Sequence, residues 1–168
     1  NDRLTGSLNY LSAEFDDLLA AYAVVCVGCG LGSVGDLDPS TTAVEQPNLA
    51  GNTVPNSPEF VAALGYDHVF HLGAAGTLTA SVFSRYKSSY YVTIFNEHDL
   101  QQDGYTQTDV NLEWRSGSER FSVQAYAQNL EDERPLVYGA FVAAGPDRIM
   151  NFAFGRPLTY GLRVGYQY

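Results

Sequence analysis

The last ten residues of the chain alternate strictly between apolar side chains and polar or small ones. One set is Tyr160, Leu162, Val164, Tyr166 and Tyr168, and the other is Thr159, Gly161, Arg163, Gly165 and Gln167. A two-residue period places the two sets on opposite faces of an extended chain. The pattern therefore predicts a β-strand with one apolar face that continues to the end of the sequence.

Five other segments show the same period, so we expect six strands in all. The predicted strands are residues 4–14, 60–71, 77–94, 105–115, 120–130 and 158–168. Ser116-Gly117-Ser118 forms a tight hairpin between two of them. These lengths are close to or above the roughly 9–11 residues with which a tilted strand crosses a bilayer. Ile94 and Leu112 are the apolar positions at which we expect arginine to cost about 2 to 4 kcal/mol at mid-bilayer.

The amino-acid composition excludes one class of protein and favours another. Acidic residues outnumber Lys and Arg by 19 to 9, which excludes a nucleic-acid-binding surface built on clustered cations. Charged residues make up 17%, below the roughly 25% of an average soluble domain, whereas aromatic residues reach 13%. These values favour a β-protein whose outer face is not wholly in water.

The connections between the predicted strands alternate in length. Residues 72–76 and 116–119 are short, whereas 15–58, 93–104 and 131–157 are long or medium. Outer-membrane barrels have this arrangement, with short periplasmic turns and long extracellular loops, and it puts both ends of the chain on the periplasmic side. A soluble sandwich would show the same alternation, with its apolar faces buried between two sheets. Long strands, and tyrosine at several strand ends, favour the barrel.

Three segments resemble motifs of TonB-dependent receptors. Residues 125–132, Ala-Tyr-Ala-Gln-Asn-Leu-Glu-Asp, resemble the A-x-N-L-F-D segment of that family, with Glu131 where Phe is usual. Residues 155–161 resemble its G-x-P-R-T-Y-G entry to the final strand, and residues 51–59 its G-x-x-[LV]-P-x-[AS]-P segment. The final strand is also similar to the C-terminal signal of outer-membrane proteins.

The resemblance implies an all-β, antiparallel, up-and-down transmembrane barrel of 22 strands, of which residues 1–168 hold the last six. The N-terminal plug domain and the segment that engages the energy-transducing TonB complex would precede Asn1. The implied function is uptake of a scarce nutrient, most commonly a ferric siderophore, with oligosaccharide and cobalamin as other family substrates. The implied location is the bacterial outer membrane, in contact with the lipid bilayer and lipopolysaccharide.

Two other functions stay open at this point. A soluble lipocalin-like protein would use the apolar face as the interior of a ligand-binding barrel, and a small structural barrel would need two more strands. No Ser/His/Asp arrangement or carboxylate pair is placed by a motif, so the sequence predicts neither an enzyme nor a cofactor.

The predicted ligand-binding residues lie in the last long loop, where aromatic side chains surround cations. They are Tyr138, Phe141, Arg148 and Phe152, with Met150 and Phe154 nearby. Such side chains can form the apolar walls and polar points of a concave site. Self-packing of the loop and contact with lipopolysaccharide explain them equally well.

Other motifs are weaker evidence for a functional site. Cys26 and Cys29 are the only cysteines, and we expect them to form a disulfide within the first loop, with free thiols as the alternative. A zinc site is not expected, because two further ligands are lacking. Residues 30–35 read G-x-G-x-x-G, but no amphipathic helix follows to support a dinucleotide. His98 lies in a polar loop, and His68 and His71 are expected near the periplasmic interface.

Overall fold

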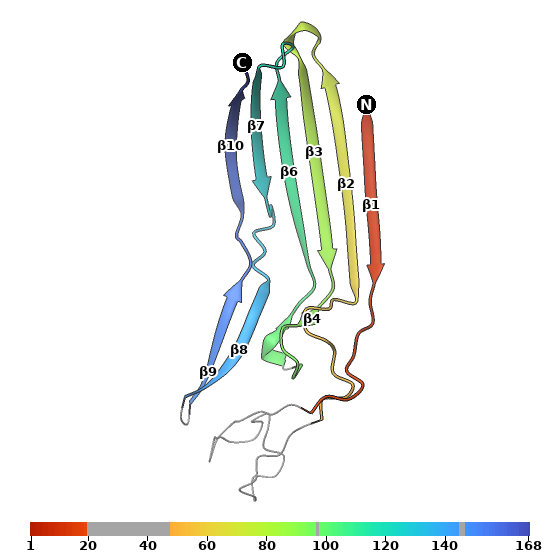
Figure 1. Cartoon of the computed structure of the whole chain (residues 1–168), viewed down its shortest axis with the longest axis vertical. Helices are drawn as coiled ribbons and strands as arrows, with labels where there is room; N and C mark the ends of the chain where they lie inside the picture. Colours follow the sequence, from red (N-terminus) through yellow and green to blue (C-terminus); the bar gives the residue numbers. More distant parts are fainter. Residues whose placement is uncertain (20–47, 97, 145–146) are drawn as a thin grey trace, which may run out of the picture.

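The computed structural model describes residues 1–19, 48–96, 98–144 and 147–168, and its main feature is one antiparallel six-stranded sheet (Figure 1). The sheet has the order β1-β2-β3-β6-β7-β10. Its strands are β1 (Asp2–Tyr10), β2 (Phe60–His71), β3 (Thr77–Lys87), β6 (Tyr105–Arg115), β7 (Phe121–Gln128) and β10 (Thr159–Tyr166). Each strand pairs antiparallel with the strand of this sheet that precedes it and the one that follows it in the sequence, as in an up-and-down sheet.

The strand register aligns the alternating apolar and polar residues of neighbouring strands across the whole sheet. One row of directly paired residues crosses all six strands and consists of Leu4, Tyr66, Val82, Val110, Ala127 and Tyr160. The neighbouring row on the opposite face is Arg3, Asp67, Ser81, Asn111, Tyr126 and Gly161. The sheet therefore has an apolar face and a polar face, which contain the first and the second row respectively.

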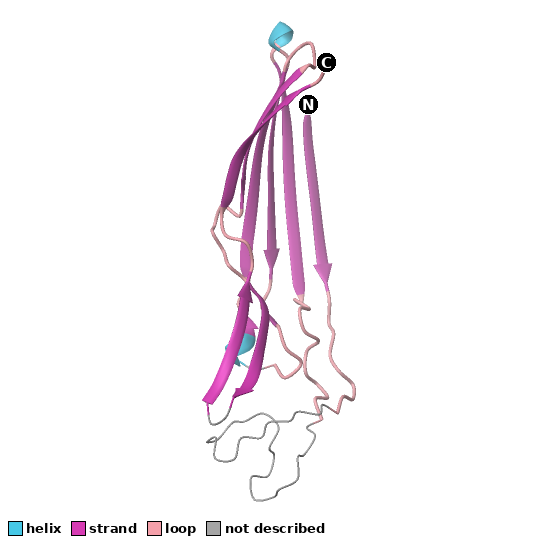
Figure 2. Ribbon diagram, turned by 60° about the vertical axis from the view of Figure 1, so that its left-hand side comes forward, coloured by secondary structure: helices cyan, strands magenta, loops and turns pink. Residues whose placement is uncertain are grey.

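Neither face of the sheet is covered by another layer in the described part of the chain (Figure 2). Leu8, Leu162 and Val164 on the apolar face are 72%, 76% and 74% exposed. The sheet does not close, since β1 and β10 each have one neighbour. The apolar face is thus an outer surface and not the interior of a small barrel.

The two ends of the sheet differ in their connections (Figure 1). Both termini lie at the end with the two short turns, as predicted, and the long links gather at the other end. Aromatic pairs occur at both ends of the apolar face, with ring centroids 5.1 Å apart for Tyr10 and Phe60 and 4.9 Å apart for Phe121 and Tyr166. These pairs match the aromatic girdles expected at the two interfaces of a membrane.

The predicted strand 77–94 is wrong in its second half. β3 ends at Lys87, and the chain then turns into the short β4 (Tyr90–Tyr91), which pairs with β5 (Gln101–Gln102). Ile94 is half-buried in this link, where its carbonyl accepts a hydrogen bond from Asn52. Ile94 is therefore not a mid-bilayer position, whereas Leu112 remains on the apolar face between Ala80 and Ala125.

A second hairpin, absent from the sequence prediction, occupies the last long link. It consists of β8 (Leu136–Ala144) and β9 (Asp147–Phe154), and it extends beyond the end of the six-stranded sheet (Figures 1 and 2). Two 3-10 turns, η1 (Gly73–Ala75) and η2 (His98–Leu100), complete the described elements. No helix among the described residues is long and apolar enough to span a membrane.

The main hydrophobic cluster lies in the long links and at the adjoining end of β6. Its members come from β4, η2, the first residue of β6 and the start of β8, and we call it the loop platform: Tyr90, Val92, Leu100, Tyr105 and Leu136. Leu100 is fully buried at its centre. The long links therefore have a small hydrophobic core of their own. The six-stranded sheet, which we call the wall, has no such core on either of its faces among the described residues.

Candidate functional site

The polar face carries hydrogen-bonded side chains that run across three strands. Gln124 on β7 donates from Nε2 to Oδ1 of Asn111 on β6 (2.6 Å), and Arg163 on β10 donates from Nη1 to Oε1 of Gln124 (3.2 Å). A hollow of about 360 Å³ lies over this part of the face, with Asp109 and Tyr126 also in its lining. The polar face can therefore contact water or polar protein groups.

Tyr126 covers a backbone position of the last strand. Gly161 pairs with Tyr126, and a Cβ atom at Gly161 would lie 2.7 Å from the Tyr126 hydroxyl oxygen. The ring can lie over β10 only because residue 161 has no side chain. This contact explains the glycine in the predicted final-strand motif.

The segment after β7 forms a second polar cluster, which we call the rim latch and define as Asn129, Glu131 and Asp132. Asn129 has a positive φ of 58° and Asp132 one of 51°, a conformation that Asn and Asp tolerate better than most residues. The left-handed Asn129 directly follows Gln128, the last residue of β7. The rim latch therefore begins where the sheet stops.

Asn129 connects three parts of the chain although it is only 5% exposed. Its Nδ2 donates to the carbonyl oxygens of Glu133 (2.8 Å) and Arg156 (2.9 Å), and its Oδ1 accepts from the Glu133 N–H (3.1 Å). Its own N–H donates to Oδ1 of Asp109 on β6 (2.9 Å). The side chain thus satisfies three backbone groups that no strand pairs.

The two carboxylates of the rim latch bind strand ends. Glu131 accepts from both the N–H (2.7 Å) and the hydroxyl (2.6 Å) of Thr108 on β6, and these bonds hold the pKa of Glu131 below its ordinary value. Asp132 accepts from the N–H of Leu158 at the entry to β10 (2.8 Å), which lowers the pKa of Asp132. The rim latch therefore ties β6, β7 and β10 together at their outer ends.

The base of the β8–β9 hairpin is fixed to the loop platform. The Leu136 N–H donates to Oε1 of Gln102 (2.5 Å), and its carbonyl accepts from the Tyr90 hydroxyl (3.2 Å). Burial raises the pKa of Tyr90, and its hydrogen bond with Tyr105 adds to this effect. Gly139 packs so closely on Leu100 that no Cβ fits there without displacement. The hairpin consequently leaves the sheet in a defined direction.

The first long link is joined to the same region by paired hydrogen bonds. The Thr53 N–H donates to Oδ1 of Asn96 (2.6 Å), and Nδ2 of Asn96 donates to the Thr53 carbonyl (3.0 Å). The Asn56 N–H donates to the Tyr91 carbonyl (2.8 Å). The described parts of all three long links are therefore held against one another.

The structure places the predicted ligand-binding residues on the two strands of the hairpin. Tyr138 and Phe141 are in β8, and Arg148 and Phe152 are in β9. Tyr138 pairs with Ala153, whereas Phe152 pairs with Gly139, so Tyr138 and Phe152 belong to opposite faces of the hairpin. The two rings are 54% and 42% exposed. The backbone register sets Phe141 opposite Met150 and Arg148 opposite Ala143.

Other predicted features are placed only in part. Cys26, Cys29 and the glycines of residues 30–35 lie outside the described residues. His98 begins η2 and is exposed. His68 and His71 lie in the last four residues of β2, toward the short-turn end.

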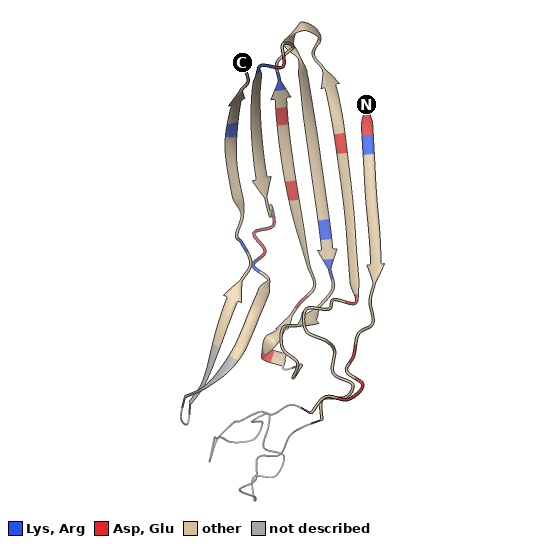
Figure 3. Cartoon of the chain, in the orientation of Figure 1, with Lys and Arg blue, Asp and Glu red and all other residues tan. Residues whose placement is uncertain are grey.

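The charge of the protein is divided unequally between the sheet and the long links. Residues 11–59, 88–104 and 129–158 hold 14 of the 19 acidic residues and only 3 of the 9 Lys and Arg residues. The strands and short turns hold the other 5 acidic and 6 basic residues, so they are close to neutral (Figure 3). In the described part of the chain, the long links therefore carry a net negative charge, whereas the sheet is close to neutral.

An open antiparallel sheet with an exposed apolar face, a polar opposite face, short turns at one end and long loops at the other defines a part of a transmembrane β-barrel wall. The family model described as "TonB dependent receptor-like, beta-barrel" matches residues 2–130. The chain belongs to this family, and its fold is that of a TonB-dependent receptor barrel. Its location is the outer membrane of a Gram-negative bacterium, and the family consists of receptors rather than enzymes.

Two solved structures resemble the chain. The ferric yersiniabactin uptake receptor FyuA from Yersinia pestis aligns with a TM-score of 0.62 and 23% identity over 71% of this chain and 18% of its own. BauA, the ferric preacinetobactin receptor from Acinetobacter baumannii, aligns with a TM-score of 0.52 and 28% identity over 70% of this chain and 16% of its own. The chain thus spans less than a fifth of either receptor. No curated protein matches it.

Proposed function

We propose that the chain is part of the wall of an outer-membrane receptor that imports a scarce nutrient, with a ferric siderophore as the first candidate. Membership of the TonB-dependent receptor family carries this proposal. The two similar structures are named as ferric-siderophore receptors, which supports the choice of substrate. The intact receptor would use the energy-transducing TonB complex and a plug domain contributed by other parts of the protein.

In this function the six strands act as a rigid frame sealed by lipid. The four inner strands β2, β3, β6 and β7 pair with a strand on both sides, as hydrocarbon requires, and β1 and β10 each leave one edge for a further strand. The polar face lines the lumen, where Asn111, Gln124 and Arg163 present hydrogen-bonding groups. The rim latch and the loop platform hold the long extracellular links above the lumen.

Ligand contact is proposed for the β8–β9 hairpin. Tyr138, Phe141, Arg148 and Phe152 supply aromatic rings and a cation on an element that projects outward. Since Tyr138 and Phe152 are on opposite faces, one ligand would meet one of these two rings, and the other ring is available to neighbouring loops or lipopolysaccharide.

The uptake proposal is tested by deleting the gene of the intact receptor and supplying radiolabelled iron as complexes of different net charge. Loss of uptake of one ferric siderophore, restored by the wild-type gene and dependent on TonB, would support it. Normal uptake of every complex under iron limitation would contradict the siderophore assignment. Uptake assays with cobalamin and oligosaccharides would then identify the nutrient class.

The hairpin assignment needs a separate comparison of variants. Tyr138→Ala and Phe152→Ala should raise the Kd of the identified ligand unequally, because the rings lie on opposite faces. Tyr160→Ala is the control, since Tyr160 is a still more exposed aromatic residue, on the apolar face of the sheet and outside the hairpin. Equal Kd values for all three variants and the wild type would remove the hairpin from the binding site.

The soluble alternative is not supported by the arrangement of the sheet. A lipocalin-like protein would enclose its apolar side chains, whereas those of β1 and β10 are more than two thirds exposed at Leu4, Leu8 and Leu162. Family membership points in the same direction.

A further inference from the structure

Two side chains on the apolar face do not fit a surface that meets only hydrocarbon. Asp2 on β1 and His68 on β2 are paired by register and are the only carboxylate and imidazole on this face of the described strands. Their side chains are 61% and 29% exposed. A carboxylate that faces lipid is unfavourable unless a partner or the headgroup region satisfies it.

The two groups form a defined cluster with Tyr66. Oδ1 of Asp2 accepts from the Tyr66 hydroxyl (2.6 Å) and from Nδ1–H of His68 (2.6 Å). Phe70 packs against the imidazole with ring centroids 4.2 Å apart, which restricts its orientation. Because the Asp2 carboxylate can only accept, Nδ1 of His68 donates to it, and in this tautomer Nε2 is the ring's acceptor.

Two acceptors receive no hydrogen bond from the described residues. These are Oδ2 of Asp2 and Nε2 of His68, which belong to side chains already joined by a hydrogen bond. A carboxylate oxygen and a ring nitrogen acceptor side by side suit a primary ammonium group, because it brings one positive charge and three N–H donors.

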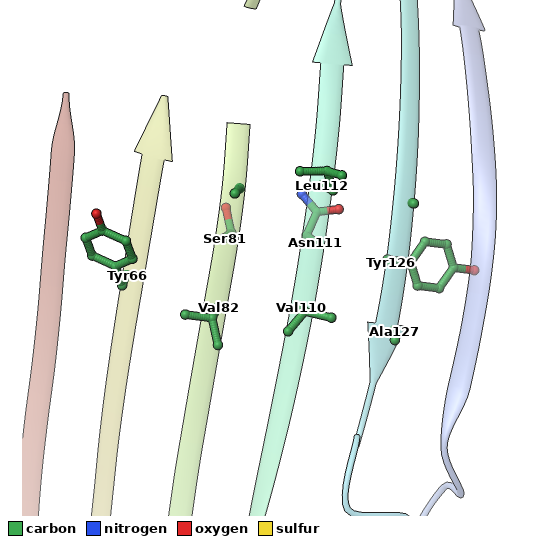
Figure 4. A pocket seen from close by; sticks show the side chains of 10 residues that line it. Tyr66, Ser81, Val82, Val110, Asn111, Leu112, Tyr126 and Ala127 are labelled. Atoms are coloured by element: carbon green, nitrogen blue, oxygen red, sulfur yellow. The ribbon is translucent and has the colours of Figure 1, made fainter. Parts of the chain in front are cut away.

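An apolar groove of about 470 Å³ begins at the same tyrosine (Figure 4). Small side chains on the apolar face, including Ala80, Ala125 and Ala127, leave it open, and Tyr66 and Leu112 are larger residues of its lining. Tyr66 therefore belongs to both features, since its ring lines the groove and its hydroxyl binds Asp2. A ligand that uses both needs an ammonium group joined to a flexible apolar chain.

We propose that Asp2, His68 and the groove form a binding site for a glycerophospholipid with an ethanolamine headgroup. The ammonium group would donate to Asp2 and His68, and one acyl chain would lie along Ala80, Ala125 and Ala127. The bilayer that already covers this face supplies the lipid, so the site continues the membrane interface of the wall. It does not depend on which nutrient the receptor imports.

Other headgroups fit the same acceptors less well. A choline headgroup has the positive charge but no N–H, so neither Asp2 nor His68 receives a hydrogen bond from it. A glycerol headgroup leaves the lipid phosphate uncompensated beside the Asp2 carboxylate, and like charges repel. The site should therefore prefer ethanolamine over choline and over glycerol when the acyl chains are identical.

The test is a lipid titration of the intact receptor in detergent, followed by native mass spectrometry. The probes are synthetic dioleoyl phospholipids with ethanolamine, choline or glycerol headgroups. The wild type should bind the ethanolamine lipid about tenfold more tightly than the choline lipid, as expected for a charge-assisted hydrogen bond. Equal apparent Kd values for the two lipids would overturn the proposal without any variant.

Two variants and their controls locate the site. Asp2→Asn should abolish the ethanolamine preference, whereas Asp67→Asn, on the opposite face of the adjacent strand, should keep it.

Ala125→Leu should weaken the binding of all three lipids alike because it fills the groove, whereas Ala63→Leu on the polar face should not. An effect of Asp67→Asn as large as that of Asp2→Asn, or an unchanged affinity in Ala125→Leu, would overturn the assignment. Nutrient uptake, measured in the same variants, should stay normal.

Discussion

The six-stranded wall and the loop platform solve the problem of burying apolar surface in opposite ways. In the platform, Leu100 is fully buried among Tyr90, Val92 and Leu136. In the wall, Leu162 is 76% exposed although it lies in the middle of a strand. The platform stabilises itself within this chain, whereas the wall depends on lipid and on neighbouring strands.

This difference explains where the polar contacts are concentrated. Within the wall, backbone pairing satisfies the main-chain polar groups of the inner strands. Where the strands end, side chains take over this task, as Asn129, Glu131 and Asp132 do in the rim latch. The wall should therefore respond to changes on its lipid-facing surface, and the outer region to changes of packing and of single hydrogen bonds.

The largest effect is expected at the centre of the platform. Leu100→Ala should cost about 2–5 kcal/mol, because it leaves a cavity where the side chain is fully buried. Hydrogen–deuterium exchange of the intact receptor should increase at the amides of Val92 and Leu136 and stay unchanged in β2 and β3. Leu130→Ala is the control, since Leu130 is 45% exposed. Faster exchange throughout the wall would show that the two regions are not independent.

A slightly smaller effect is expected in the wall. Leu112→Arg should destabilise the receptor by about 2–4 kcal/mol in lipid vesicles, because the arginine faces hydrocarbon. Asn111→Arg on the polar face of the same strand should cost much less. The free energy of unfolding, measured by denaturant titration in vesicles, compares the two variants. Similar costs for both would invert or abolish the assignment of the faces.

The sequence predicted the wall well because the wall follows a local rule. Alternation defines β2 and β6 at the bounds observed, since both faces of these strands have uniform surroundings. The same rule failed after Lys87, because Tyr90 and Val92 keep the phase of β3 but are buried in the platform. A two-residue period cannot distinguish a longer strand from apolar residues that pack in a loop core.

The outer region was less predictable because its contacts are non-local. β8 and β9 have almost continuous apolar runs without alternation, although Gly145-Pro146 between them is a turn signal that could have indicated a hairpin. Asn129 and Asp132 were recognised as parts of a family motif, but their role follows only from bonds to Arg156 and Leu158, which are more than 20 residues away.

An intermediate effect is expected at the rim latch. Asn129→Ala should cost about 1–3 kcal/mol, because the carbonyl groups of Glu133 and Arg156 lose their donor in a site that is largely closed to water. Exchange should increase at the start of β10 and at the base of β8. Asn111→Ala removes the acceptor of Gln124 on the polar face, where water can replace it, and should therefore have a smaller effect. An unchanged β10 entry would show that backbone pairing alone orders it.

The smallest effect is a pH dependence of the rim latch. Hydrogen bonds from Thr108 and Leu158 lower the pKa values of Glu131 and Asp132 in the folded protein from ordinary values of 4.5 and 3.8. Carboxylates with lowered pKa contribute stability above their unfolded values, and this contribution is lost as the pH falls through the folded values. Exchange at the amides of Thr108 and Leu158 should therefore be constant from pH 7 to about pH 5, after correction for intrinsic rates, and increase in more acidic buffer.

Glu131→Gln should remove the pH dependence at Thr108 but keep it at Leu158. A pH dependence that survives at both amides in the Glu131→Gln, Asp132→Asn double variant would show that other groups control the outer rim.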